Sequence, residues 1–199
     1  MHNIKAKTSI DSPLNIAELE ISQTGGRLGL TLCPGKKDLP YRWDRDLTMD
    51  MQVIRAWGAS TVITLIEDHE FSLLAVSNLG NQVDAMGMAW LHLPIRDVDI
   101  PDHRFELGWK AAGPLLHQQL DAGERILIHC RGGMGRTGLV AGRILVERGM
   151  APHDAIREVR AARPRAIETR AQEQYVLDTN SVKKNNVINR SLGEPDCHQ

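Results

Sequence analysis

The segment from residue 125 to residue 148 constrains the fold more than any other part of the chain. Arg125 to His129 is a short apolar run that is typical of a buried strand. A glycine-rich stretch follows, and Leu139 to Arg148 then has helical spacing, with Gly149 as its expected C-cap. A strand that passes through a glycine-rich turn into a helix is a building unit of α/β sheets.

Strands and helices alternate along the rest of the chain. Three more segments read as strands: Leu28–Leu32, Thr61–Ile66 and Ala89–Leu93. Four more read as helices: Leu47–Trp57, Asp102 to Gly123, Ala151–Ala162 and Arg170–Asp178. This alternation predicts an α/β fold with a mostly parallel central sheet flanked by helices on both faces. Ligands bind beyond the carboxyl ends of such strands, so the strand ending at His129 points at the site.

Length and charge set the expected organisation. The 199 residues fit one domain, and we expect it to span residues 25–178. Residues 1–24 are expected to form a loosely ordered N-terminal segment, and residues 179–199 a disordered polar tail. The 24 basic and 25 acidic side chains give a net charge of −1. That balance argues against nucleic acid as a partner of the whole molecule.

Cysteine usage and hydropathy predict the compartment. Cys33, Cys130 and Cys197 are odd in number and far apart, which is no disulfide framework and suits a reducing compartment. The first residues lack the apolar region of a signal peptide, and no apolar run is long enough to span a bilayer. We therefore expect a cytoplasmic protein with no membrane span, and the oligomeric state stays open.

Residues 129–138 read His-Cys-Arg-Gly-Gly-Met-Gly-Arg-Thr-Gly. Glycines let successive N–H groups converge on one point, and the following helix directs its positive end there. Arg136 adds a planar, two-pronged donor that suits phosphate oxygens. The segment thus predicts a phosphate-binding cradle between Cys130 and Arg136, made of Arg131, Gly132, Gly133, Met134 and Gly135.

The same features predict a reactive thiol. A helix N-terminus and a nearby cation favour the thiolate, and a thiolate inside a phosphate cradle is placed to attack phosphorus. The Thr137 hydroxyl could hydrogen-bond this thiolate as it leaves, and His129 is expected to orient the loop. A Walker-type loop is excluded because Lys-Ser/Thr is missing after the last glycine. A metal site is disfavoured because Cys130 has no second cysteine nearby.

The loop from Leu93 to Asp102 carries the candidate acids. Thiolate attack on a phosphate ester expels an oxygen anion that needs a proton. Asp97, Asp99 and Asp102 all follow a predicted strand, so each is a candidate. Asp102 stands where a helix N-cap is expected, which favours a structural role for it.

These motifs resemble the dual-specificity branch of the cysteine-dependent protein tyrosine phosphatase superfamily, whose signature is HC-x5-R-[S/T]. The match is closest to the kinase-associated phosphatase type, with its PI-x-D-x3-P loop and its LIHC-x-GG-x-GR strand and cradle. Here the loop is Pro94-Ile-Arg-Asp97 with Pro101, and the strand and cradle run from Leu127 to Arg136. The resemblance spans roughly residues 26–177 and implies a protein tyrosine phosphatase-like fold.

The resemblance also implies roles. Cys130 would be the nucleophile, Arg136 the phosphate clamp, Asp97 the general acid and then base, and Thr137 the thiolate partner. Gln172 matches a position that lies near the site in relatives and would position water. Relatives of this type have no metal or organic cofactor. The departure is Asp97-Val-Asp99, where the kinase-binding family has Asp-Gly-Gly; it leaves Asp99 as an alternative acid and puts inherited kinase-partner specificity in doubt.

The expected function is hydrolysis of phosphate monoesters on proteins, namely phosphotyrosine and also phosphoserine or phosphothreonine, through a phosphocysteine. Two alternatives stay open: a non-hydrolytic phosphate-binding pseudophosphatase, and a phosphatase for a non-protein phosphate ester. Because Arg131 is the only extra cation in the cradle, a highly charged lipid headgroup is disfavoured. Cys33 reads as a buried core residue, with a protective disulfide to Cys130 as the alternative.

Overall fold

A computed structural model describes residues 6–21 and 24–179. Its main sheet has five strands in the order β1-β2-β7-β5-β6. The pairs β2–β7, β7–β5 and β5–β6 are parallel, and only the edge pair β1–β2 is antiparallel. The strands are β1 (Ala17–Glu20), β2 (Arg27–Leu32), β5 (Ala59–Thr64), β6 (Ala89–His92) and β7 (Arg125–Cys130).

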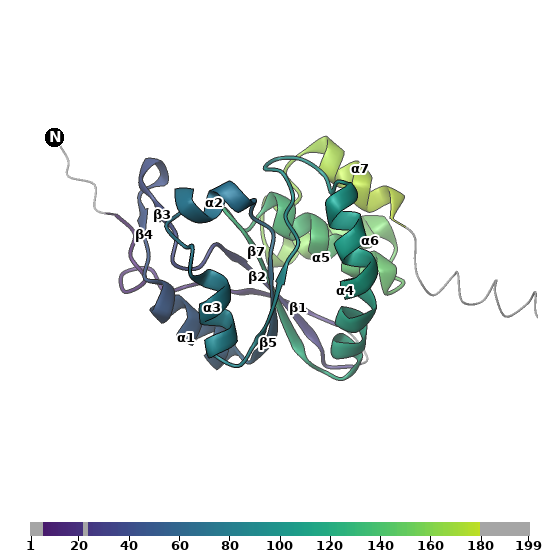
Figure 1. Ribbon diagram of the computed structural model, residues 1–199. Helices are drawn as coiled ribbons and strands as arrows, with labels where there is room; N and C mark the ends of the chain where they lie inside the picture. Colours follow the sequence, from purple (N-terminus) through teal and green to yellow (C-terminus); the bar gives the residue numbers. More distant parts are fainter. Residues whose placement is uncertain (1–5, 22–23, 180–199) are drawn as a thin grey trace, which may run out of the picture.

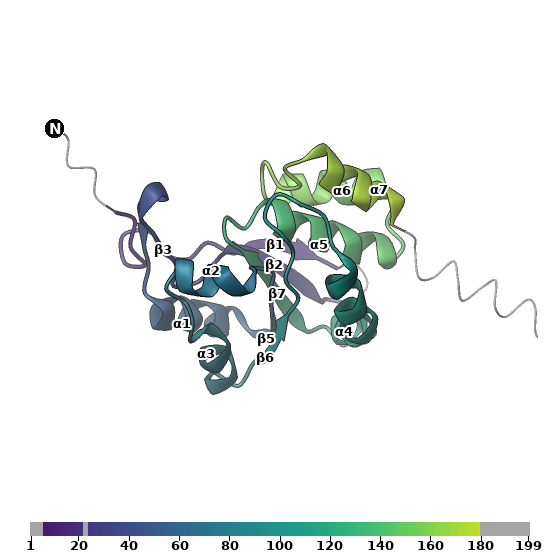
Figure 2. The same ribbon diagram turned by 45° about the horizontal axis from the view of Figure 1, so that its top comes forward.

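Helices cover both faces of this sheet (Figure 1). One face packs on α1 (Leu47–Trp57) and α3 (Leu79–Ala85), and the other on α4 (His103–Asp121) and α5 (Gly135–Glu147). Figure 2 shows α6 (Pro152–Ala162) and α7 (Arg170–Asp178) outside α5, which contacts both. The predicted α/β fold is confirmed. None of the helices in the described residues is long and apolar enough to cross a membrane.

Each layer contributes a separate apolar core. Leu28, Ile63, Ile126 and Ile128 face α4 and α5, while Val62 and Leu127 face the α1 side. The central strand β7 therefore buries side chains on both faces, which explains its continuous apolar run. Burial at about 25 cal/mol per Å² of apolar surface makes these two cores the main source of stability.

The carboxyl ends of the central strands meet at one edge. Leu32 of β2 is aligned with Cys130 of β7, and Thr64 of β5 is aligned with His129. Short elements follow these ends and surround the edge. They are β3 (Lys37–Asp38), the 3₁₀ helix η1 (Leu39–Tyr41), β4 (Trp43–Asp44) and α2 (Asp68–Leu73).

The N-terminal segment differs from the expectation. Residues 1–24 were expected to be loosely ordered, but Ala17–Glu20 forms the edge strand β1, and Leu14, Leu19 and Ile21 are buried. A four-residue strand has too weak a pattern to stand out in the sequence, and its pairing with β2 is what makes it a strand. The predicted tail falls largely on residues 180–199, which lie outside the described residues.

Helix boundaries follow local signals where those are strong. The Asp46 side chain accepts a hydrogen bond from the Met49 N–H at the start of α1, and Gly58 ends it with φ 89°. By contrast, α5 begins at Gly135 rather than at the expected Leu139. Glycine has low helix propensity, so the first turn of α5 depends on tertiary packing. The short helices α2 and α3 were not predicted, because six and seven residues are too few to show a clear helical periodicity.

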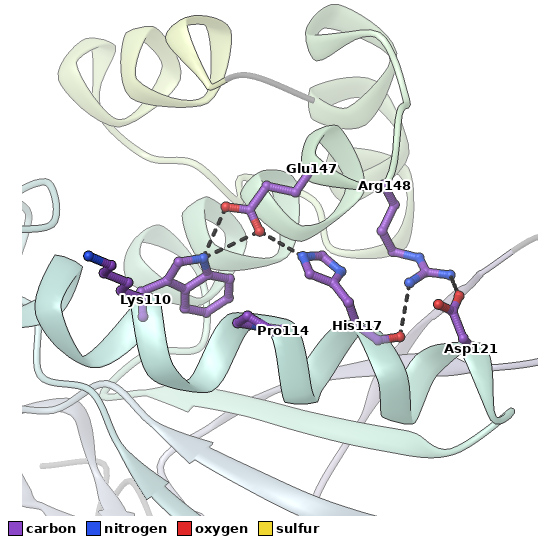
Figure 3. A pocket seen from close by; sticks show the side chains of 8 residues that line it. Lys110, Pro114, His117, Asp121, Glu147 and Arg148 are labelled. Carbon is purple, nitrogen blue, oxygen red and sulfur yellow. Dashed lines mark hydrogen bonds and ion pairs between the residues drawn. The ribbon is translucent and has the colours of Figure 1, made fainter. Parts of the chain in front are cut away.

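A cavity of about 380 Å³ lies between α4 and the end of α5, away from the carboxyl edge of the sheet (Figure 3). Glu147 lies beside it and is only 8% exposed. Its carboxylate accepts hydrogen bonds from Trp109 Nε1 at 3.0 Å, His117 Nε2 at 2.8 Å and Arg143 Nε at 2.7 Å. Burial alone would raise the pKa of Glu147, but the bonds from His117 and Arg143 outweigh it and lower that pKa.

Glu147→Gln is expected to lower the free energy of unfolding by about 1–3 kcal/mol at neutral pH, because it removes a buried charged acceptor. A carboxyl whose pKa is lowered by folding stabilises the protein above its unfolded pKa of 4.5. The difference from the parent should therefore shrink as the pH falls below that value. Urea unfolding at a series of pH values measures this. Glu158→Gln on exposed α6 is the control and should change stability by less than about 0.5 kcal/mol; a pH-independent loss in Glu147→Gln would contradict the assignment.

Candidate active site

The cradle begins where β7 ends. Cys130 is 3% exposed, and the backbone N–H of Gly133 donates a hydrogen bond to its Sγ at 3.2 Å. Gly133 has φ 71°, and a Cβ at this position would lie 2.3 Å from the carbonyl oxygen of Thr31. Only glycine fits so close to the backbone of β2. The turn that glycine allows here directs the Gly133 N–H at the thiol. The helix α5 starts at Gly135 and directs its N-terminal end at the same place.

Arg136 is held in place by the carboxylate of Glu70, a residue that the sequence did not predict near the site. Its Nη1 and Nη2 lie 2.5 Å and 3.1 Å from the two carboxylate oxygens of Glu70 in α2, and Nη1 also donates to Ile95 O at 3.1 Å. Burial alone would raise the pKa of Glu70, but the hydrogen bonds from Arg136 outweigh it and lower that pKa. Glu70 is therefore ionised and holds the guanidinium in one orientation.

One donor of Arg136 has no protein partner in the described part of the chain. This donor is its Nε, which is buried. A buried donor without a protein partner is uncommon and is typical of a group that binds a ligand. The same holds for the Thr137 hydroxyl, which is buried and unpartnered within the described part of the chain. Both positions suit the predicted roles of phosphate clamp and thiolate partner.

His129 lies behind Cys130 and is fully buried. Its Nε2 is hydrogen-bonded to Thr64 Oγ1 at 2.8 Å, and that oxygen also accepts from Trp90 Nε1 at 2.9 Å. Burial lowers the pKa of His129 to about 3, so the imidazole is neutral at physiological pH. A neutral, tethered imidazole suits the predicted orienting role better than proton transfer.

The three carboxylates of the loop from Leu93 to Asp102 make different contacts. Asp97 Oδ1 lies 2.9 Å from Arg136 Nη2, so this carboxylate reaches the cradle while its side chain stays 52% exposed. Asp99 accepts a hydrogen bond from the N–H of Ile100 within the loop. Asp102 caps α4 by accepting from Phe105 N at 2.9 Å, as predicted. Of the three carboxylates, Asp97 is the one that contacts Arg136, and its role as the acid remains a prediction.

Gln172 is fully buried. Its Oε1 accepts from Glu168 N at 2.9 Å, and its Nε2 donates to the carbonyl oxygen of Asp99 at 3.1 Å. It also completes the capping box of α7 with Thr169. In this structure Gln172 therefore ties the acid loop to α7, and water positioning remains a prediction.

The side chain of Arg131 leaves the cradle. Its Nε and Nη2 donate to both carboxylate oxygens of Asp38, at 2.9 Å and 3.0 Å, and its guanidinium lies 5.3 Å from the Tyr41 ring. Arg131 thus contributes its backbone to the cradle and braces η1 with its side chain. Tyr41 and Leu39 are exposed beside it and form an apolar rim.

Cys33 is a core residue and forms no disulfide with Cys130, the alternative that the sequence left open. It is fully buried in the core on the α1 side, and burial raises the pKa of its thiol. In the described residues, no three His, Cys, Asp or Glu side chains are grouped so that they could hold a metal ion. Glu70 and Lys36 were not anticipated around the cradle. The only sequence signal for Glu70 was its position just after the carboxyl end of a strand next to β7.

The fold and this site define the class of the protein. The chain belongs to the DSP-PTPase phosphatase domains, since the family described as "Swiss Army Knife protein, DSP-PTPase phosphatase domain" matches residues 44–176. Mouse "Cyclin-dependent kinase inhibitor 3" is 30% identical to it over 171 residues, which cover 83% of this chain and 78% of the mouse protein. The predicted family resemblance is confirmed.

Two solved structures place the fold among phosphatases. Kinase associated phosphatase, with its catalytic-site cysteine replaced by serine, matches with a TM-score of 0.73 and 29% identity over 83% of this chain and 93% of that one. PTPMT1 in complex with PI(5)P matches with a TM-score of 0.61 over 88% and 99% of the two chains. The second pair is 16% identical, so that likeness concerns the fold alone.

Proposed function

We propose that this protein is a phosphatase that hydrolyses phosphate monoesters on proteins, on phosphotyrosine and also on phosphoserine or phosphothreonine, through a phosphocysteine. The observation that carries the proposal is one cluster of side chains at the carboxyl edge of the sheet. There the Cys130 thiol receives a backbone N–H, and Arg136 is held by Glu70 and contacts Asp97. Family membership supports the same chemistry.

The reaction has two steps. In the first, the Cys130 thiolate attacks phosphorus, the bond from phosphorus to the ester oxygen breaks, and protonated Asp97 gives its proton to the leaving oxygen. In the second, Asp97 takes a proton from water, the water oxygen attacks phosphorus, and the sulfur–phosphorus bond breaks to return the thiolate. The Thr137 hydroxyl stabilises that thiolate, while Arg136 and the cradle N–H groups bind the phosphoryl oxygens.

The rim supports a protein substrate. Asp38 binds the Nε–Nη2 edge of the Arg131 guanidinium and so directs this side chain toward η1 rather than into the cradle, which disfavours its use for a second phosphate. Leu39 and Tyr41 are 80% and 66% exposed next to it and suit the side chains that flank a phosphorylated residue. The thiolate mechanism needs reduced Cys130, which supports a cytoplasmic setting.

A substrate panel tests the proposal. Purified full-length protein is offered phosphotyrosyl, phosphoseryl and phosphothreonyl peptides, a phosphoinositide and a nucleoside monophosphate, and released phosphate is measured. We expect turnover on the peptides and, after rapid acid quench, a phosphoryl adduct on Cys130 by mass spectrometry. Phosphate binding without turnover on any substrate would identify a pseudophosphatase. Turnover on the phosphoinositide or nucleotide alone would overturn the protein substrate.

Asp97→Asn is expected to lower kcat for alkyl phosphates such as phosphoserine by about 10²–10⁴-fold. The loss should be much smaller with an activated aryl phosphate, whose leaving group departs without a proton. The alkaline limb of the kcat/KM profile should also flatten, to the extent that this limb reports loss of the protonated acid. Asp99→Asn is the matched control and should leave both substrates largely unaffected. If the leaving-group dependence appears in Asp99→Asn instead, the assignment of the acid is wrong.

A further inference from the structure

Three successive carbonyl groups of the cradle are each bound from outside by a cation. Lys36 Nζ donates to the carbonyl oxygen of Arg131 at 2.9 Å. Arg163 donates to the next two, from Nη2 to Gly132 O at 3.3 Å and from Nε to Gly133 O at 2.6 Å. The two cations come from separate segments, the loop after β2 and the C-terminal end of α6.

These contacts determine where the cradle N–H groups point. The carbonyl of one residue and the N–H of the next share a plane and point in opposite directions. Holding the carbonyl of Arg131 outward therefore turns the N–H of Gly132 inward, and the same applies to the next two peptides. The structure shows this for the middle peptide, where Gly132 O contacts Arg163 while Gly133 N donates to the thiol at 3.2 Å.

The cradle needs such support because its own sequence is permissive. Gly132, Gly133 and Gly135 make up three of the five residues between Cys130 and Arg136, and glycine adopts many backbone conformations with little cost. A flipped peptide would direct a carbonyl oxygen, not an N–H, at a bound phosphate. An external donor on each of the three carbonyls disfavours that flip.

Within the described residues neither cation has a carboxylate in ion-pair contact, although Lys36 is 3% exposed and Arg163 is half-buried. Lys36 has only the longer-range attraction of Asp38 and the face of the Trp43 ring, and no carboxylate in the described part of the chain acts on Arg163. Burying a cation without a counter-charge is costly. Both interact electrostatically with Cys130, so their positive charge acts on the centre of the cradle. An anion bound there would supply the missing counter-charge.

We propose that Lys36 and Arg163 are positioning residues of the cradle, which hold its N–H groups in the anion-binding orientation and whose charge the bound phosphate balances. The proposal rests on the proposed function only for its effect on turnover. Its effect on the binding of inorganic phosphate stands whether or not the protein hydrolyses esters.

The test compares Lys36→Met and Arg163→Gln in the full chain, with inorganic phosphate as the probe. Titration calorimetry should show the phosphate Kd raised about tenfold or more in each variant, and kcat should fall with it. Lys37→Met, which removes the neighbouring exposed lysine, and Arg157→Gln on the exposed face of α6 are the matched controls and should bind phosphate like the parent. Arg163→Lys keeps the charge and should recover part of the binding.

Two readouts separate positioning from simple loss of structure. The amide NMR signals of Gly132, Gly133 and Met134 should move in the variants, while those of the sheet residues stay in place. Thermal unfolding shows which variants are folded, and if Lys36→Met fails to fold, the Arg163→Gln and Arg163→Lys pair decides. Folded variants with a phosphate Kd within about twofold of the parent would overturn the proposal. A parent that binds phosphate but hydrolyses nothing would refute the proposed function alone.

Discussion

Replacing Cys130 with serine is expected to abolish turnover while leaving phosphate binding largely intact. The serine hydroxyl is a far weaker nucleophile than the thiolate, so kcat should fall by roughly 10⁴-fold or more, as expected on loss of a catalytic nucleophile. The cradle survives because its shape depends on Gly133, Lys36 and Arg163 rather than on sulfur. Calorimetry with inorganic phosphate and assays on phosphotyrosyl peptide measure the two properties separately.

The matched control for this variant is Cys33→Ala. Cys33 is as buried as Cys130 but lies in the core on the α1 side. Its truncation removes one sulfur from a packed interior and should cost stability of the order of 1 kcal/mol, with kcat unchanged. Full turnover in Cys130→Ser, or the absence of a phosphoryl adduct in the parent protein, would refute the thiolate mechanism.

Arg136→Lys should lower kcat by about 10³–10⁵-fold, the scale associated with an arginine that stabilises phosphoryl transfer. Lysine keeps the charge but loses the planar fork that spans Glu70 on one side and the ligand on the other. Glu70→Gln should have a smaller effect, because Arg136 would keep its contact with Ile95 O but lose the ionised partner that orients it. Steady-state kinetics on one phosphopeptide compares the two.

The control for Arg136 is Arg148→Lys, at the end of α5, where the arginine pairs with Asp121 beside the cavity in Figure 3. That change should leave kcat and KM close to those of the parent. If Arg136→Lys raises KM without lowering kcat, Arg136 only binds substrate and does not stabilise the transition state. A fall in kcat for Arg136→Lys and not for Arg148→Lys supports the clamp.

The sequence by itself determined the parts whose signal is local. The β7 strand, the cradle and α5 follow one another within a single segment, so residue order alone placed Cys130 and Arg136 at the two ends of one glycine-rich cradle. The parallel sheet followed from the alternation of strands and helices, and the limits of α1 from the helical spacing of Leu47–Trp57. Such features depend on backbone preferences and periodicity within a few residues.

Only the tertiary structure decided what surrounds the cradle. Glu70, Lys36 and Arg163 come from three separate segments. Glu70 and Lys36 follow parallel strands that end at the same edge of the sheet, and Arg163 reaches the cradle from the end of α6. Asp97 is the loop carboxylate that reaches Arg136, a contact that spacing alone left open and that supports its proposed role as the acid. The strand β1 exists because β2 offers it a hydrogen-bonding edge. In each case the deciding interaction joins residues far apart in the chain, and no local pattern encodes it.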